Sequence, residues 1–271
     1  MQYFGGKSKI VKHIVPYLES VRKENQLYIE PFVGGCSVIS NMSGERIGYD
    51  FNKYLIELYK AIQEWYVLPD SITKEEYDYI KQNKDENKAL TGFVGFGCSF
   101  AAKWFGGYAR DKKKKCDFAY TAKQGLNKKF ETMQDVKFIW SDYKQLKPSG
   151  CLIYCDPPYV NTTQAYGTGD FDTEEFWNVI REWSKNNDVY ISEYVAPDDF
   201  ECVLEVQTKT DIRNSENQLD KRVEKLFKYK NFANWKSDLL GKFLPVANKL
   251  AGGKPPPLSD WIIFRSTFGG R

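Results

Sequence analysis

The sequence predicts an α/β fold built around a largely parallel sheet. Short apolar runs typical of strands alternate along the chain with segments whose apolar residues recur at helical spacing. Three of the apolar runs end at an acidic residue, which is typical of strands that lead into a ligand-binding loop. The 271 residues, 42% hydrophobic and 28% charged, suit one elaborated domain or two small ones.

Each element is predicted from a local pattern. Apolar residues between positions 10 and 21 predict an amphipathic helix with Ser8 as N-cap, which Pro16 kinks or splits. Three further helices are predicted to begin at the capping residues Asn52, Thr73 with Glu76, and Asp172 with Glu175. Strands are predicted at 27–29, 46–49, 136–140, 151–155, 189–192, 203–206 and 223–227.

Residues 66–133 interrupt the alternation with a helical, glycine-containing, basic stretch, which predicts an insertion carrying a second small domain. The α/β core is then expected at 1–65 and 134–230, followed by a C-terminal extension at 231–271 whose role the sequence does not indicate. Between Lys88 and Lys129, ten Lys and Arg residues against two acids give +8, so that the rest of the chain carries −5 of the net +3. Eight aromatic residues share this window.

A basic segment interleaved with aromatic residues suits a nucleic acid whose bases can be stacked upon, although a solvated lysine-rich loop over an aromatic core explains the charge equally well. Within it, Trp104, Phe105 and Tyr108 are expected to form the insertion's own small core. Composition excludes other classes. The six Cys lack a CxxC spacing and there is one His, which argues against zinc sites and His-dependent hydrolysis. The sequence shows no transmembrane run or signal peptide.

Two segments carry chemistry. Residues 30–35 (EPFVGG) follow a predicted strand, where paired glycines let a ligand approach the backbone, and Asp50 ends the next strand, where an acid can accept hydrogen bonds from ribose hydroxyls. An ordinary turn and a helix-capping acid are the plain alternatives. Residues 153–159 (IYCDPPY) lead an apolar strand into an acid, two prolines and an aromatic residue. The Asp156 carboxylate and the Pro157 carbonyl can accept both N–H groups of a planar amine, and Tyr159 can stack on its ring.

The order of residues 4–7 (FGGK), 30–35, Asp50 and 156–159 (DPPY) resembles the Dam-type (D12 class) DNA adenine N6-methyltransferases. The resemblance covers about residues 1–230, and residues 192–197 are similar to phage or prophage members. It implies a Rossmann-like S-adenosylmethionine-dependent core with a mostly helical target-recognition insertion. It also implies catalytic roles for Asp156, Pro157 and Tyr159, and cofactor contacts from Tyr3, Lys7, Glu30, Phe32, Gly34, Asp50, Asp142, Tyr143 and Asp156.

The activity implied by the resemblance is transfer of a methyl group from S-adenosylmethionine to an adenine flipped out of double-stranded DNA, in the cytoplasm of a bacterium or a phage-infected host. No metal and no membrane are expected, and a restriction endonuclease partner is compatible with the family. A DNA-binding protein with a silent site and an RNA or protein amine methyltransferase are the alternatives. The residues expected to bind DNA are Lys103, Arg110, Lys112, Lys113, Lys114, Lys115 and Lys123.

Overall fold

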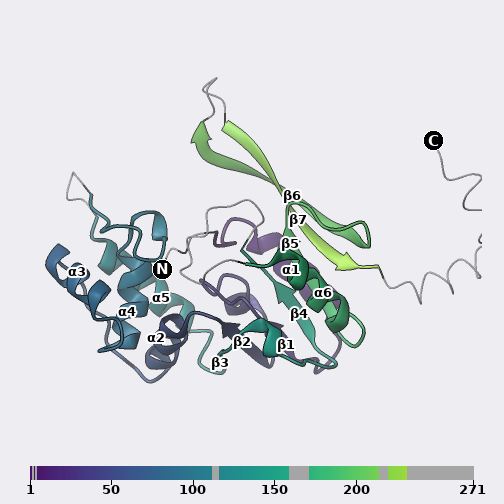
Figure 1. Ribbon diagram of the computed structural model, residues 1–271, viewed down its shortest axis with the longest axis horizontal. Helices are drawn as coiled ribbons and strands as arrows, with labels where there is room; N and C mark the ends of the chain where they lie inside the picture. The colour runs from purple at the N-terminus through teal and green to yellow at the C-terminus, as the bar shows by residue number, and fades with distance from the viewer. Residues whose placement is uncertain (2, 4, 112–115, 159–170, 214–218, 231–271) are drawn as a thin grey trace, which may run out of the picture. The chain divides into compact units, whose positions relative to one another are not determined.

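A seven-stranded sheet in the order β3-β2-β1-β4-β5-β7-β6 organises residues Met1–Tyr229 in the computed structural model (Figure 1). The structure describes residues 1, 3, 5–111, 116–158, 171–213 and 219–230. Residues Lys230–Arg271 form a separate unit, of which only Lys230 is described. The strands are β1 (Tyr28–Glu30), β2 (Arg46–Asp50), β3 (Lys137–Trp140), β4 (Leu152–Cys155), β5 (Asp188–Glu193), β6 (Phe200–Arg213) and β7 (Leu219–Tyr229).

The first five strands of this order run parallel, and β7 and β6 add an antiparallel hairpin at one edge. The order turns at β1, which pairs with β2 on one side and with β4 on the other. Ligands of open α/β sheets bind beyond the carboxyl ends of the strands at such a switch point. The predicted Rossmann-like α/β class is therefore confirmed.

Six α-helices and three short 3-10 helices complete the part of the chain that the structure describes. The α-helices are α1 (Val11–Val21), α2 (Lys53–Gln63), α3 (Lys74–Gln82), α4 (Lys88–Gly97), α5 (Phe118–Phe130) and α6 (Thr173–Trp183). The 3-10 helices are η1 (Ile39–Asn41), η2 (Phe100–Ala102) and η3 (Tyr143–Gln145). The predicted caps Asn52, Thr73 and Asp172 each accept a hydrogen bond from a first-turn backbone N–H. The Ser8 cap is wrong: α1 starts after Ile10 and runs through Pro16 as one helix.

Alternate side chains of the central strands pack into two apolar layers. In β1, Tyr28 belongs to one layer and Ile29 to the other, and in β4, Tyr154 and Ile153 divide in the same way. Residues of α1, α2, α4 and α5 join the first layer, and residues of α6 join the second. The sheet is thus covered on both faces, as buried parallel strands require. None of the described helices is both long and apolar enough to span a membrane.

The inserted segment is mostly helical, as predicted, because α3, α4 and α5 all lie within 66–133; Figure 1 shows them grouped beside α2. It shares the apolar layer of the sheet: Phe93 and Phe130 belong to the same cluster as Tyr59 and Phe138. Gly92 lets α4 approach α2, since a Cβ there would lie 2.2 Å from the Tyr54 carbonyl oxygen. The boundaries 1–65, 66–133 and 134–230 stay a prediction.

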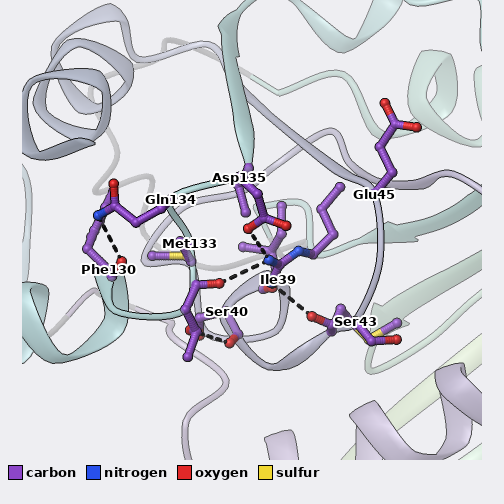
Figure 2. A network of polar contacts seen from close by, with 12 residues as sticks. Ile39, Ser40, Ser43, Glu45, Phe130, Met133, Gln134 and Asp135 are labelled. Atoms are coloured by element: carbon purple, nitrogen blue, oxygen red, sulfur yellow. Dashed lines mark hydrogen bonds and ion pairs between the residues drawn. The ribbon is translucent and has the colours of Figure 1, made fainter. Parts of the chain in front are cut away.

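A buried arginine at the start of β2 joins the end of the inserted segment to the sheet. Arg46, 6% exposed, donates to the carbonyl oxygens of Ile39 and Met42 at 3.1 and 2.9 Å. Its other terminal nitrogen donates to the Thr132 carbonyl at 2.9 Å and to the Asp135 carboxylate (Figure 2). These bonds fix the chain that follows α5 against η1, so that β3 enters the sheet next to β2.

Candidate active site

Acidic residues of three neighbouring strands meet at one edge of the sheet. Glu30 ends β1, Asp50 ends β2 and Asp156 directly follows β4. These strands are parallel neighbours, so their carboxyl ends lie side by side. Glu30 is 3% exposed and Asp50 is 8% exposed. The structure therefore brings together acids that lie more than a hundred residues apart in the sequence.

Lys7 and Asp156 form an ion pair at this edge. The Lys7 ammonium nitrogen lies 2.8 Å from Asp156 Oδ1 and 4.0 Å from Glu224 Oε2, and it donates to the Gly5 carbonyl at 3.2 Å. Lys7 is 6% exposed, whereas Asp156 is partly exposed. The contact between the Lys7 ammonium and the Asp156 carboxylate is thus a short charge-assisted hydrogen bond. Pro157, next to Asp156, is buried.

Glu30, at the end of β1, lies close enough to Asp156 to be affected by its charge. The Tyr28 hydroxyl donates to Glu30 Oε1 at 2.7 Å. Burial raises the pKa of Glu30 to about 8, the hydrogen bond from Tyr28 opposes the rise, and the nearby charge of Asp156 adds to it. In the folded protein, the Glu30 carboxyl therefore carries a proton at neutral pH.

The loop that follows β1 and contains Gly34 and Gly35 is held by contacts with neighbouring side chains. Gly34 has φ +44°, its N–H donates to Asp50 Oδ2 at 3.0 Å, and its carbonyl accepts from the Tyr59 hydroxyl. Cβ atoms at Gly34 and Gly35 would lie 2.9 and 2.5 Å from the Tyr3 side chain, so the glycines make room for that ring. Asp50 Oδ1 also accepts from the Asn52 N–H at 2.9 Å. Burial raises the pKa of Asp50 to about 6, against these backbone hydrogen bonds.

The weaker pair of predicted cofactor residues, Asp142 and Tyr143, lies beside Phe32. The rings of Phe32 and Tyr143 are 5.0 Å apart, and Tyr143 is 8% exposed within the apolar layer shared with α6. Asp142 caps η3 by accepting from the Lys144 N–H at 3.0 Å. Both residues therefore have a packing or capping role in addition to any ligand contact. Tyr159 and Lys112–Lys115, also predicted, lie outside the described residues.

The inserted segment divides its aromatic residues between core and surface. Trp104 stacks on Tyr54 of α2 with ring centroids 5.6 Å apart, and Phe105 is 6% exposed. Both therefore pack in the interior, but in the cluster shared with the sheet and not in a core of the insertion's own. Phe100, by contrast, is 69% exposed. It precedes Ala101 and Ala102, both with positive φ, which turn the backbone sharply.

The described basic residues predicted to bind DNA differ in environment. Arg110 is exposed, and its guanidinium lies 5.5 Å from the centre of the Tyr108 ring. Lys103 is partly buried. Lys123 forms an ion pair with Asp70 at 2.8 Å, which a phosphate contact would have to replace. Among these three, Arg110 is the residue most open to a phosphate.

Comparison with known proteins agrees with the motifs. Residues 3–94 match the family model of the D12 class N6 adenine-specific DNA methyltransferases. The match is confined to these N-terminal residues of the chain. The match includes Tyr3, Lys7, Glu30 and Asp50, and it ends before Asp156. The recognition based on motif order is thus confirmed, while the phage or prophage affiliation stays a prediction.

Two curated relatives are similar to this chain over part of their length. The type II methyltransferase M.FokI of Planomicrobium okeanokoites is 23% identical over 209 residues, which are 67% of this chain and 32% of the relative. The DNA adenine methylase of Vibrio cholerae is 30% identical over 192 residues, which are 59% of this chain and 64% of the relative. The matched regions thus span about a third and just under two thirds of these relatives.

Solved structures resemble this chain only distantly. The precorrin-6y C5,15-methyltransferase of Geobacter metallireducens has a TM-score of 0.34 at 8% identity, covering 82% of this chain and 88% of its own. The precorrin 8w decarboxylase of Methanobacterium thermoautotrophicum has a TM-score of 0.36 at 8% identity, covering 81% and 89%. The fold class of the chain rests on its own strand order.

The sequence does not predict three residues at the carboxyl edge of the sheet. Glu193, at the end of β5, is 3% exposed and accepts from the Tyr194 N–H at 2.6 Å. Glu224 lies on β7, and Lys129 of α5 donates to the Gly35 carbonyl. Burial lowers the pKa of Lys129. These residues carry no motif, and only the pairing of β5 with β7 and the packing of α5 bring them to the site.

Proposed function

We propose that this chain is a site-specific DNA adenine N6-methyltransferase that moves a methyl group from S-adenosylmethionine to an adenine flipped out of duplex DNA. The observation that carries the proposal is the buried Lys7 paired with Asp156 at the carboxyl edge of the sheet. Asp156 begins the DPPY segment, whose acid suits an exocyclic amine. The D12-class match over residues 3–94 supports the same activity.

The charge of the site suits S-adenosylmethionine. Asp50 and Asp156 lie at the same carboxyl edge of the sheet, and their carboxylates favour a ligand that carries a sulfonium and an ammonium. We assign its binding to Tyr3, Lys7, Glu30, Phe32, Gly34, Asp50, Asp142, Tyr143 and Asp156. When bound, the cofactor supplies an electrophilic methyl group.

The protein's contribution to the reaction is mainly positioning. An aromatic amine is a weak nucleophile because its lone pair is delocalised into the ring. The Asp156 carboxylate and the Pro157 carbonyl accept its two N–H groups, which favours a pyramidal nitrogen with its lone pair aimed at the methyl group. Tyr159 stacks against the base. Holding the two reactants in line lowers the barrier without a strong base.

DNA binding is assigned to the inserted segment. Arg110, Lys103, Lys123 and Lys112–Lys115 supply positive charge for phosphates, and the exposed Phe100 supplies an aromatic face for a base. We place this reaction in the cytoplasm of a bacterium or phage-infected host. Residue 156 is Asp, whereas Asn is usual at this position in glutamine-modifying enzymes, and this favours DNA over protein.

Transfer of labelled methyl from S-adenosylmethionine tests the proposal. Unmethylated duplex DNA, RNA of the same sequence and a protein extract are offered separately, and the products are digested and resolved as nucleosides or amino acids. We expect label only in N6-methyladenine from duplex DNA, and sequencing of the methylated positions then gives the recognition site. Bound cofactor without N6-methyladenine would contradict the proposal, and label in RNA or protein would favour the alternatives.

A further inference from the structure

Glu224 faces the ion pair of the proposed active site from an unexpected element. It lies on β7, the antiparallel strand next to β5, and its Oε2 is 4.0 Å from the Lys7 ammonium. Its side chain is 16% exposed. The Tyr194 hydroxyl, just beyond the end of β5, donates to Glu224 Oε1 at 3.4 Å. Glu224 is therefore held near the Lys7 ammonium by a strand pairing and a hydroxyl.

We propose that Glu224 is a positioning residue that acts through Lys7 to set how strongly Asp156 accepts hydrogen bonds. The inference rests on the proposed function, in which Asp156 receives an N–H of the target amine. Glu224 does not contact the amine in this scheme. Its effect passes through the Lys7 ammonium, which lies within 4.0 Å of both carboxylates.

The single positive charge of Lys7 is shared between the carboxylates of Asp156 and Glu224. The Lys7 ammonium has three N–H donors: one is bonded to the Gly5 carbonyl, one lies at 2.8 Å from Asp156, and its charge also faces Glu224. With Glu224 ionised, the attraction of Lys7 is divided, and Asp156 keeps more negative charge for another donor. Without that charge, Lys7 neutralises Asp156 more fully, so that Asp156 becomes a weaker acceptor for the amine.

The neighbourhood supports a functional coupling of these groups. Tyr154, fully buried on β4, has its pKa raised well above the usual value, first by burial and then by the charge of Asp156, with smaller contributions from Glu30 and Glu224. The charges of Asp156 and Glu224 thus both act on one buried hydroxyl. Lys7 contacts both carboxylates. Substitution of Lys7 should therefore remove the effect of Glu224 on Asp156.

A double-mutant cycle tests the inference. Methyl transfer to duplex DNA is measured at saturating cofactor and DNA for the wild type, Glu224→Gln, Lys7→Met and the double variant. We expect Glu224→Gln to lower kcat about tenfold, the size of an ordinary coupling between contacting groups. Its Kd for S-adenosylmethionine should change less than about twofold. In the Lys7→Met background the same substitution should change kcat less than about twofold, because the intermediary is gone.

Two further variants make the result specific. Glu205→Gln removes one carboxylate charge from the same hairpin, where Glu205 is 58% exposed and pairs with Lys225 at 3.6 Å, and it should leave kcat unchanged. Tyr194→Phe, which frees Glu224 from its hydroxyl partner, should lower kcat by about threefold. Unchanged kcat in Glu224→Gln, or an equal loss in both Lys7 backgrounds, would overturn the role of Glu224 alone. A weakened cofactor Kd with unchanged kcat would make Glu224 a cofactor ligand. A wild type that transfers no methyl to DNA would overturn the proposed function and this inference with it.

Discussion

The carboxyl edge of the sheet and the inserted segment use charge in opposite ways. At the edge, Lys7, Glu30 and Asp50 are each less than a tenth exposed, and each contacts a named partner. In the insertion, Arg110 is exposed and Phe100 is 69% exposed. A buried charge depends on a few fixed neighbours, whereas a surface that binds a polyanion sums many weak contacts. Single substitutions should therefore be severe in the first region and graded in the second.

The severest effect should come from Asp156→Ala. It removes the proposed acceptor for the amine and leaves the buried ammonium of Lys7 with one fewer counter-charge. We expect methyl transfer to fall by at least about a thousandfold, as for loss of a residue that positions the reacting group. Cofactor affinity should weaken only partly, measured by calorimetry on the same samples.

A matched control separates this effect from general loss of charge. Asp78→Ala removes an acid from the surface of α3, where Asp78 pairs with Lys74, and it should retain wild-type transfer. Substantial activity in Asp156→Ala would remove the contrast between the two regions, because the edge would then tolerate loss of its central acid.

The burial of Glu30 should make the stability of the protein depend on pH. The pKa of Glu30 is raised from 4.5 to about 8, so between these values the folded protein holds a proton that the unfolded chain releases. The free energy of unfolding should therefore fall as pH rises, by roughly 1.4 kcal/mol per unit in that interval from this group. Glu30→Gln should lose this part of the slope in urea denaturation between pH 5 and 8.5 without cofactor.

Exposed Glu64, at the C-cap of α2, provides the comparison for that experiment. Glu64→Gln should keep the wild-type slope. If Glu30→Gln keeps it as well, the carboxyl of Glu30 is ionised in the folded protein, and the edge is better solvated than its burial indicates.

Much of the fold and of the site followed from local patterns. Asn52, Thr73 and Asp172 predict helix starts because side-chain capping is decided within four residues. Glu30 and Asp50 were predicted at the site because parallel strands deliver their carboxyl ends to one edge. These inferences need only the order of elements and the residues at strand ends.

The features of the site that the sequence does not predict depend on contacts between distant segments. Glu224 reaches Lys7 through an antiparallel pairing of β7 with β5 that an alternating α/β pattern does not predict. The sequence identifies Lys129 only as part of a basic stretch. In the structure, α5 packs so that the Lys129 ammonium donates to the Gly35 carbonyl. The glycines of that loop were expected to admit a ligand, and the structure shows that they also accommodate the Tyr3 ring. Local sequence carries no record of such partners.

A smaller effect is expected from Phe100→Ala. Loss of a stacking side chain costs about 1–3 kcal/mol per base, so the affinity for duplex DNA should fall by about tenfold. Cofactor affinity should stay unchanged, since Phe100 lies in the insertion. Trp65→Ala is the control, because Trp65 is 81% exposed at the end of α2, before the insertion. The affinity for DNA is measured by fluorescence anisotropy. An equal loss of affinity in both variants would mean that Phe100 contributes only general apolar surface.

The smallest effect per residue should come from the lysine run. Each lysine that neutralises a phosphate contributes about 0.9 to the slope of log affinity against log salt concentration. Replacing Lys112–Lys115 with Gln should flatten that slope and lower affinity equally for cognate and unrelated duplexes, because phosphate contacts carry no sequence information. The matched control replaces Lys137, Lys144, Lys147 and Lys185, four exposed lysines outside the insertion. If both quadruple variants flatten the slope equally, binding follows total charge, and the insertion loses its special place in DNA recognition.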